Sequence, residues 1–226
     1  MNFSEDWTDG AKRVAPRETS FLSAWQDRAV RSLAPRIPAK VSAADLTKIS
    51  VMGAAIAAAA LLACRWEIWF VLLVPIGVAV NWIGAAVDAP LRDHRQQFGS
   101  RHKLTEHLAD LVAQLLVIVA YGLSPFLSLG SAAVVLACYL LFSAYSFIRV
   151  AAGREGQMAL IGIGAAEFRI LMAFWPFAAL ALGLARPGSG DFSPLDYAIV
   201  LLAAIAVVNL GLKVVFDGRR ISSARG

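Results

Sequence analysis

A small set of carboxylates lies at or near the ends of long apolar segments, where charge is costly and function is the usual reason for keeping it. These acids are Asp88, Glu106, Asp110 and Glu167. Glu106 and Asp110 are four residues apart, so on a helix they face the same way. Converging carboxylates suit Mg²⁺ or Mn²⁺, which offset their repulsion, and this favours a metal-assisted reaction on a phosphate-bearing substrate. Helix capping by Asp88 and dipole-favoured first-turn positions for Glu106 and Asp110 explain the same acids without chemistry.

The composition indicates that a membrane surrounds these acids. Of the 226 residues, 58% are hydrophobic and 16% are charged, whereas about a quarter of the residues in soluble domains are charged. We expect an all-α polytopic membrane protein with six transmembrane helices, because six apolar stretches are long enough to cross about 30 Å of hydrocarbon. The first can lengthen toward Val41, since Asp45 and Lys48 are tolerated near headgroups. The stretches are predicted near residues 49–64, 68–87, 104–121, 131–150, 160–184 and 195–216.

The positive charges predict the orientation of the chain. All of the 21 Lys and Arg except Arg65 and Arg186 lie in or beside the segments that share one side with the N-terminus. Cytoplasmic segments carry this excess of basic residues, so we expect both termini in the cytoplasm and an integral protein of the bacterial cytoplasmic (inner) membrane. The net charge of +5 then records orientation, and we expect no nucleic-acid partner.

Three segments are predicted along the chain. Residues 1–40 form a cytoplasmic N-terminal segment, in which apolar residues at helical spacing over 19–34 predict an amphipathic helix. That helix lies on the membrane interface or packs on the membrane domain or a partner. Residues 41–218 form the membrane domain, and residues 219–226 form a cytoplasmic tail. The alanine-rich run 54–60 provides a close-packing surface for another helix or for a second copy of the chain, which makes a homodimer one expected arrangement.

The spacing of the acids resembles the CDP-alcohol phosphatidyltransferase family, whose six-span enzymes carry D-x-x-D-G-x-x-A-R followed by G-x-x-x-D-x-x-x-D. With Asp88 at the second aspartate, the third and fourth acids fall on Glu106 and Asp110. Two further segments are similar to the choline and ethanolamine phosphotransferase branch. IPAKVSAADLT at residues 37–47 looks like its P-x-x-L-T segment, and GIGAAEFR at residues 162–169 looks like its G-P-T-E-x-R segment. The resemblance extends from about residue 20 to the sixth stretch.

The resemblance implies a transferase of phospholipid biosynthesis. It would move a phosphoalcohol or phosphatidyl group from a CDP-linked donor to an acceptor hydroxyl and release CMP, with at least one substrate a lipid. Asp88, Glu106 and Asp110 would bind Mg²⁺ or Mn²⁺, and Asp110 would also accept the proton of the attacking alcohol. Arg92 and Arg95 would contact the diphosphate, although both also suit a positively charged cytoplasmic loop.

The chain departs from the family motif at several positions. Ala85 stands at the first aspartate, Ala89 at the glycine after the second, and His102 at the later glycine. The A-R pair falls on Arg92 and Asp93, and the third acid is Glu in place of Asp. Loss of one ligand, and of glycines that let a nucleotide approach the helix backbone, weakens the usual nucleotide site.

Two interpretations follow from these departures. In one, the site is rebuilt around Asp88, Glu106 and Asp110, with Asn81, Asp93 and Glu167 as auxiliary candidates. Asn81 precedes Ala85 by one helical turn and can face the same way, although an Asn in a span is often a packing residue. In the other, the fold persists without the reaction, and the protein is a catalytically degenerate lipid-binding or membrane scaffold protein.

Overall fold

The computed structural model describes residues 28–29, 32–33, 36–38, 40–95, 100–151, 165–185 and 194–223. Over these ranges the chain is helical and contains no strand. The elements are α3 (Ala43–Ala63), the 3₁₀ helix η2 (Ile68–Leu72), α4 (Leu73–Arg95), α5 (Ser100–Gly122), α6 (Leu129–Ala151), α7 (Ala165–Ala181) and α8 (Pro194–Ser223). The all-α class predicted from the sequence is confirmed.

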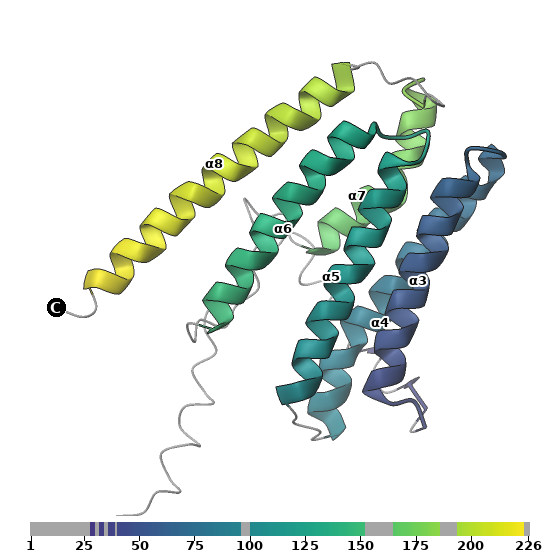
Figure 1. The fold of residues 1–226 in the computed structure, drawn as a ribbon. Coiled ribbons are helices and arrows are strands. Elements are labelled where there is room, and N and C mark those ends of the chain that lie inside the picture. The colour runs from purple at the N-terminus through teal and green to yellow at the C-terminus, as the bar shows by residue number, and fades with distance from the viewer. Residues whose placement is uncertain are drawn as a thin grey trace, which may run out of the picture.

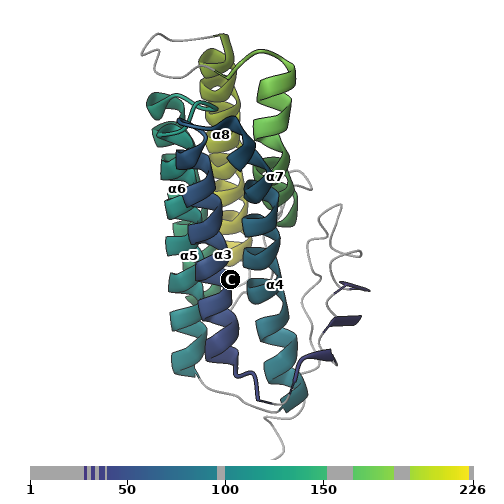
Figure 2. The ribbon, with the colours of Figure 1, turned by 90° about the vertical axis from the view of Figure 1, so that its right-hand side faces the viewer.

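The long helices run side by side, and α8 is inclined to α3 and α4 in the view of Figure 1 (Figures 1 and 2). α3 packs against both α4 and α5, and α7 packs against α4. α6 lies between α5 and α8, which places α8 on the outside of the bundle (Figure 1). The bundle core is therefore formed mainly by α3, α4, α5 and α7.

Several of these helices have the length and composition of membrane spans. Three described segments are long and apolar enough to cross a bilayer, namely residues 44–63, 68–87 and 194–215. Shorter apolar helices cover residues 108–122 and 129–145. Within the chain, 44% of the apolar window of the first segment is buried but only 6% of the last. Apolar surface left open on this scale is unfavourable in water, and it supports a membrane protein.

α7 ends earlier than the predicted stretch 160–184, whose first residues lie outside the described ranges. Gly183 adopts a left-handed conformation with φ of +65°, which a residue without a side chain accepts easily. The N–H of Leu184 then donates to the carbonyl of Ala179 at 2.8 Å, and the N–H of Gly183 donates to Leu180 at 3.1 Å. These paired bonds form a Schellman motif that satisfies the last carbonyls of the helix.

α3 and α4 approach each other so closely that their backbones touch. A Cβ added at Gly53 would lie 2.3 Å from the backbone nitrogen of Asn81, and one added at Gly77 would lie 2.5 Å from that of Ala57. Such crossings need small residues at the contact. The alanine-rich run lies in this part of α3, and its members Ala54, Ala57, Ala58 and Ala60 are buried. The run therefore packs against other helices of the same chain.

The described part of the N-terminal segment packs on the bundle. Most of the predicted amphipathic helix 19–34 lies outside the described residues, but Leu33 and Ile37 contact a small apolar cluster around Leu46 of α3 and Val87 of α4. This contact connects the segment to the end of the bundle where α3 begins and α4 ends.

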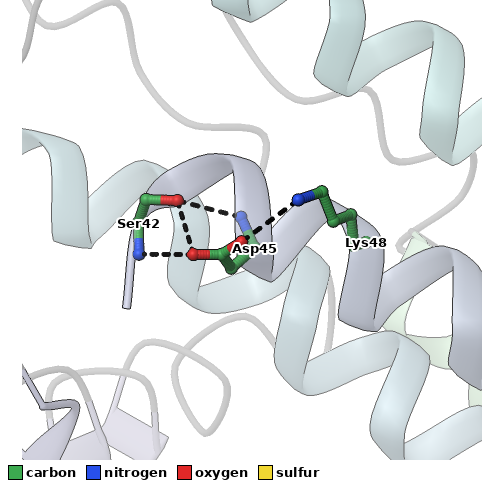
Figure 3. A network of polar contacts seen from close by, with 3 residues as sticks. All are labelled: Ser42, Asp45 and Lys48. Atoms are coloured by element: carbon green, nitrogen blue, oxygen red, sulfur yellow. Dashed lines mark hydrogen bonds and ion pairs between the residues drawn. The ribbon is translucent and has the colours of Figure 1, made fainter. Parts of the chain in front are cut away.

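A polar network fixes the start of α3 (Figure 3). The Ser42 hydroxyl accepts a hydrogen bond from the Asp45 N–H at 3.2 Å, and the Asp45 carboxylate accepts one from the Ser42 N–H at 3.1 Å. This reciprocal pair is a capping box, which satisfies backbone donors that have no partner in the first turn. Lys48 lies 3.3 Å from the same carboxylate. The helix consequently begins at Ala43, in agreement with the extension predicted toward Val41.

We expect Ser42→Ala to lower the melting temperature by about 2 to 4 °C, because a lost N-cap costs roughly 1 kcal/mol in a chain of this size. Ser32→Ala is the matched control, since the Ser32 hydroxyl only donates to a carbonyl, that of Ala29, at 2.7 Å. Thermal unfolding in detergent micelles measures both. Equal shifts in the two variants would contradict the capping role of Ser42.

At the opposite end of the bundle, a buried acid joins α8 to α6. Asp196 lies in the first turn of α8 and is 2% exposed. It accepts hydrogen bonds from the hydroxyls of Ser128 and Ser131. The Ser128 hydroxyl also accepts from the Ser131 N–H at 3.1 Å, which caps the start of α6. The outermost helix is thus held to the bundle by polar bonds as well as by apolar packing.

Candidate functional site

An ion pair joins α5 to α7 in the interior of the bundle. Nη2 of Arg169 donates to Oδ1 of Asp110 at 2.7 Å. Arg169 is 7% exposed, whereas the Asp110 side chain is 37% exposed. Nε of Arg169 is also buried and has no acceptor among the described residues. A guanidinium this deeply buried depends on its carboxylate partner, because an unpaired buried charge is strongly unfavourable.

Buried amides extend the polar character of this region across the bundle. A small cleft between α3, α4, α5 and α7 is lined by Asn81, Gln114 and Arg169 together with apolar side chains of the same helices. Nδ2 of Asn81 donates to the carbonyl of Ser50 at 3.0 Å and to the Ser50 hydroxyl at 2.9 Å. These bonds account for the burial of Asn81 by packing between α3 and α4.

The backbone places two of the predicted metal ligands at matching levels. Asp88 precedes Arg95, the last residue of α4, by seven positions, and Glu106 follows Ser100, the first residue of α5, by six. At 1.5 Å per residue, both lie about 10 Å along their helices from the connection between them. Asp110 lies one turn further into the bundle. Positions 88 of α4 and 106 of α5 therefore lie at about the same level of the structure.

The described side chains include only part of the predicted site. The structure describes the backbone but not the side chains of Asp88, Arg92, Asp93, Arg95 and Glu106. Among the side chains that are described, no group of three His, Cys, Asp or Glu is placed to hold a metal ion. Asp110 alone, already paired with Arg169, does not make such a site. A divalent ion would fit here only with additional oxygen ligands, and Asp88 and Glu106 have the right chemistry and level to supply them.

Arg169 is the residue that sequence reasoning misses. From the sequence it counts only as one of the basic residues that lie in or beside the segments on the side of the N-terminus. In the structure Glu167 is half-buried in the first turn of α7, and Arg169 pairs with Asp110. The available signal is that a charge at membrane depth needs an opposite partner. Asp110, an acid on another apolar stretch, is a candidate for that partner.

Comparisons of the chain with protein-family models, with curated proteins and with solved structures give no significant match. The resemblance to the phosphotransferase motif therefore depends on the residues quoted from the sequence.

Proposed function

We propose that this chain is a six-span membrane phosphotransferase whose site lies at the end of the bundle where α4 and α5 connect. It transfers a phosphoalcohol or phosphatidyl group from a CDP-linked donor to an acceptor hydroxyl and releases CMP. The observation that carries the proposal is the Asp110–Arg169 ion pair. It places a carboxylate of fixed orientation one turn from the level of Asp88 and Glu106.

The proposed roles follow from chemistry and position. Asp88 and Glu106, with Asp110, would hold Mg²⁺ or Mn²⁺, which when bound offsets the charge of a diphosphate. Arg92 and Arg95, further along α4, would contact phosphate oxygens. Arg169 engages one oxygen of the Asp110 carboxylate, so the other can accept the proton of the acceptor alcohol.

The location suits a reaction between a lipid and a soluble molecule. One of the two substrates must reach the site from the bilayer and the other from water, and acids about 10 Å from the helix ends satisfy both requirements. With both termini in the cytoplasm, as the basic residues predict, the site would face the cytoplasm.

In lipid vesicles supplied with a panel of radiolabelled CDP-alcohols and lipid acceptors, we expect Asp88→Asn and Glu106→Gln to lower Mg²⁺-dependent CMP release by about 100-fold or more, because each loses a metal ligand. Glu67→Gln is the matched control, since Glu67 is exposed at the far end of the bundle, before η2. Variants that turn over as fast as the wild-type protein would remove Asp88 and Glu106 from the site.

A scaffold without catalytic activity is the second candidate function. Ala85 and Ala89 replace motif residues, and the charge of Asp110 is already compensated within the protein by Arg169. Binding of Mn²⁺, measured by electron paramagnetic resonance with and without CDP, separates the two functions. A protein that binds no Mn²⁺ at millimolar concentration in either condition favours the scaffold.

A further inference from the structure

A proline interrupts the hydrogen-bond ladder of α7. Pro176 lies inside the helix and is fully buried. Since proline has no N–H, the carbonyl of Met172, four residues earlier, lacks its usual helical donor. The Tyr121 hydroxyl, from the last turn of α5, donates to the carbonyl oxygen of Met172. A side chain of α5 thus replaces the backbone donor that the proline removes from α7.

The same face of α5 also carries the ion pair. Asp110, Gln114, Val117 and Tyr121 follow one another at intervals of four, three and four residues, which places them along one side of the helix. Asp110 at one end of this face binds Arg169, and Tyr121 at the other end binds the carbonyl of Met172. Arg169 and Met172 are three residues apart in α7, so they belong to adjoining turns on one side of that helix.

We propose that Tyr121 is a positioning residue for Arg169. Its hydroxyl compensates for the missing N–H of Pro176 and thereby holds the turn of α7 that presents Arg169 to Asp110. Without the hydroxyl, the buried carbonyl of Met172 loses the donor that the structure gives it, which is unfavourable. The turn then shifts to find one, and the contact between Arg169 and Asp110 loosens. The effect of Tyr121 on the packing of α7 does not depend on the proposed function. Only its effect on catalysis rests on that function.

A double-mutant cycle tests the packing role. We expect Tyr121→Phe to lower the melting temperature in micelles by about 2 to 12 °C, the range for one buried acceptor left unsatisfied in a chain of this size. Pro176→Ala restores an N–H to the helix, so the Met172 carbonyl regains a donor. In the Pro176→Ala background, we expect Tyr121→Phe to lower the melting temperature by less than about half of its effect in the wild-type background. Equal shifts in both backgrounds would overturn the proposal.

Trp175→Phe is the matched control for the cycle. Nε1 of Trp175 donates to the carbonyl of Phe126 at 3.1 Å, which also ties α7 to the segment after α5. This bond involves no carbonyl that Pro176 deprives of a donor. Its loss is therefore expected to cost the same with Pro176 or with Pro176→Ala. Rescue of both variants by Pro176→Ala would show a general effect of the proline and would contradict a specific role for Tyr121.

A second measurement follows Arg169 itself. The non-additivity of Asp110→Ala and Arg169→Met, measured as shifts in melting temperature, is expected to decrease in the Tyr121→Phe background, and an unchanged value would overturn the positioning role.

At temperatures where all variants are folded, Tyr121→Phe should lower kcat for CMP release with little change in KM, and Pro176→Ala should restore kcat. If the wild-type protein releases no CMP, the proposed function fails, whereas the melting temperatures still decide the role of Tyr121.

Discussion

Asp110→Ala is expected to destabilise the protein by about 3 to 5 kcal/mol, the cost of leaving one member of a buried ion pair without its partner. Arg169 remains in place and is 7% exposed, so its guanidinium has little access to water. Its Nε already has no acceptor among the described residues, which leaves the charge with even less compensation. Denaturant unfolding in mixed micelles measures the change in free energy.

The ion pair should respond asymmetrically to mutation. Arg169→Met is expected to cost less than Asp110→Ala, because the Asp110 side chain is 37% exposed and retains access to solvent. The double variant Asp110→Ala/Arg169→Met should be more stable than Asp110→Ala alone, since no uncompensated charge remains. Glu67→Ala, at an exposed position, serves as the control and should stay within about 0.5 kcal/mol of the wild-type value. A similarly small effect of Asp110→Ala would contradict the burial and pairing of Arg169.

Gly53→Leu and Gly77→Leu are expected to prevent α3 and α4 from packing and to abolish the cooperative unfolding transition. Even the single methyl of Gly53→Ala would lie 2.3 Å from a backbone nitrogen of α4, and backbone atoms cannot turn aside as a flexible side chain can. Overpacking of this kind costs about 1 to 3 kcal/mol or more, so we expect Gly53→Ala to fall at the upper end of that range.

The bundle contains its own control for this prediction. Gly211 lies in α8, and a Cβ added there meets no atom of another helix within 4 Å among the described residues. Gly211→Ala is therefore expected to raise stability by about 0.5 to 1 kcal/mol through helix propensity alone. Denaturant unfolding of the three alanine variants measures the changes in the free energy of unfolding. We expect it to fall for the variants at Gly53 in α3 and Gly77 in α4, and to rise for the variant at Gly211 in α8. Destabilisation by Gly211→Ala equal to that by Gly53→Ala would contradict the close crossing.

The length of each apolar stretch predicts its helix well, because a segment must be long enough to cross the hydrocarbon whatever the other segments do. The predicted stretch 68–87 corresponds to η2 and the apolar part of α4, and 195–216 corresponds to the apolar part of α8. The ends depend on capping. Ser42 with Asp45 moves the first helix start to Ala43, and charged residues continue α8 to Ser223, beyond its apolar run.

Contacts between helices could not be predicted in the same way. The spacing rule relates Glu106 to Asp110 within one helix, but it says nothing about which residue of α7 meets Asp110. That pairing depends on how α5 and α7 pack, as does the contact of Tyr121 with the carbonyl freed by Pro176. The apolar stretch 104–121 does predict that Asp110 lies on a helix, as it does in α5. The sequence also identifies Asn81 as a candidate packing residue, which its bonds to Ser50 bear out.

The central claim is that the carboxylate of Asp110 takes part in transfer from a CDP-linked donor. Its most direct test is CMP release in lipid vesicles with Mg²⁺ or Mn²⁺, comparing the wild-type protein with Asp110→Asn. The amide oxygen can still accept the hydrogen bond from Arg169, so we expect Asp110→Asn to be less destabilised than Asp110→Ala and to be assayed below its unfolding transition. Because an amide is a poor proton acceptor, we expect its rate to be lower by about 100-fold to 10,000-fold. Equal CMP release by the two proteins, or none from the wild-type protein with any CDP-alcohol donor, would contradict the claim.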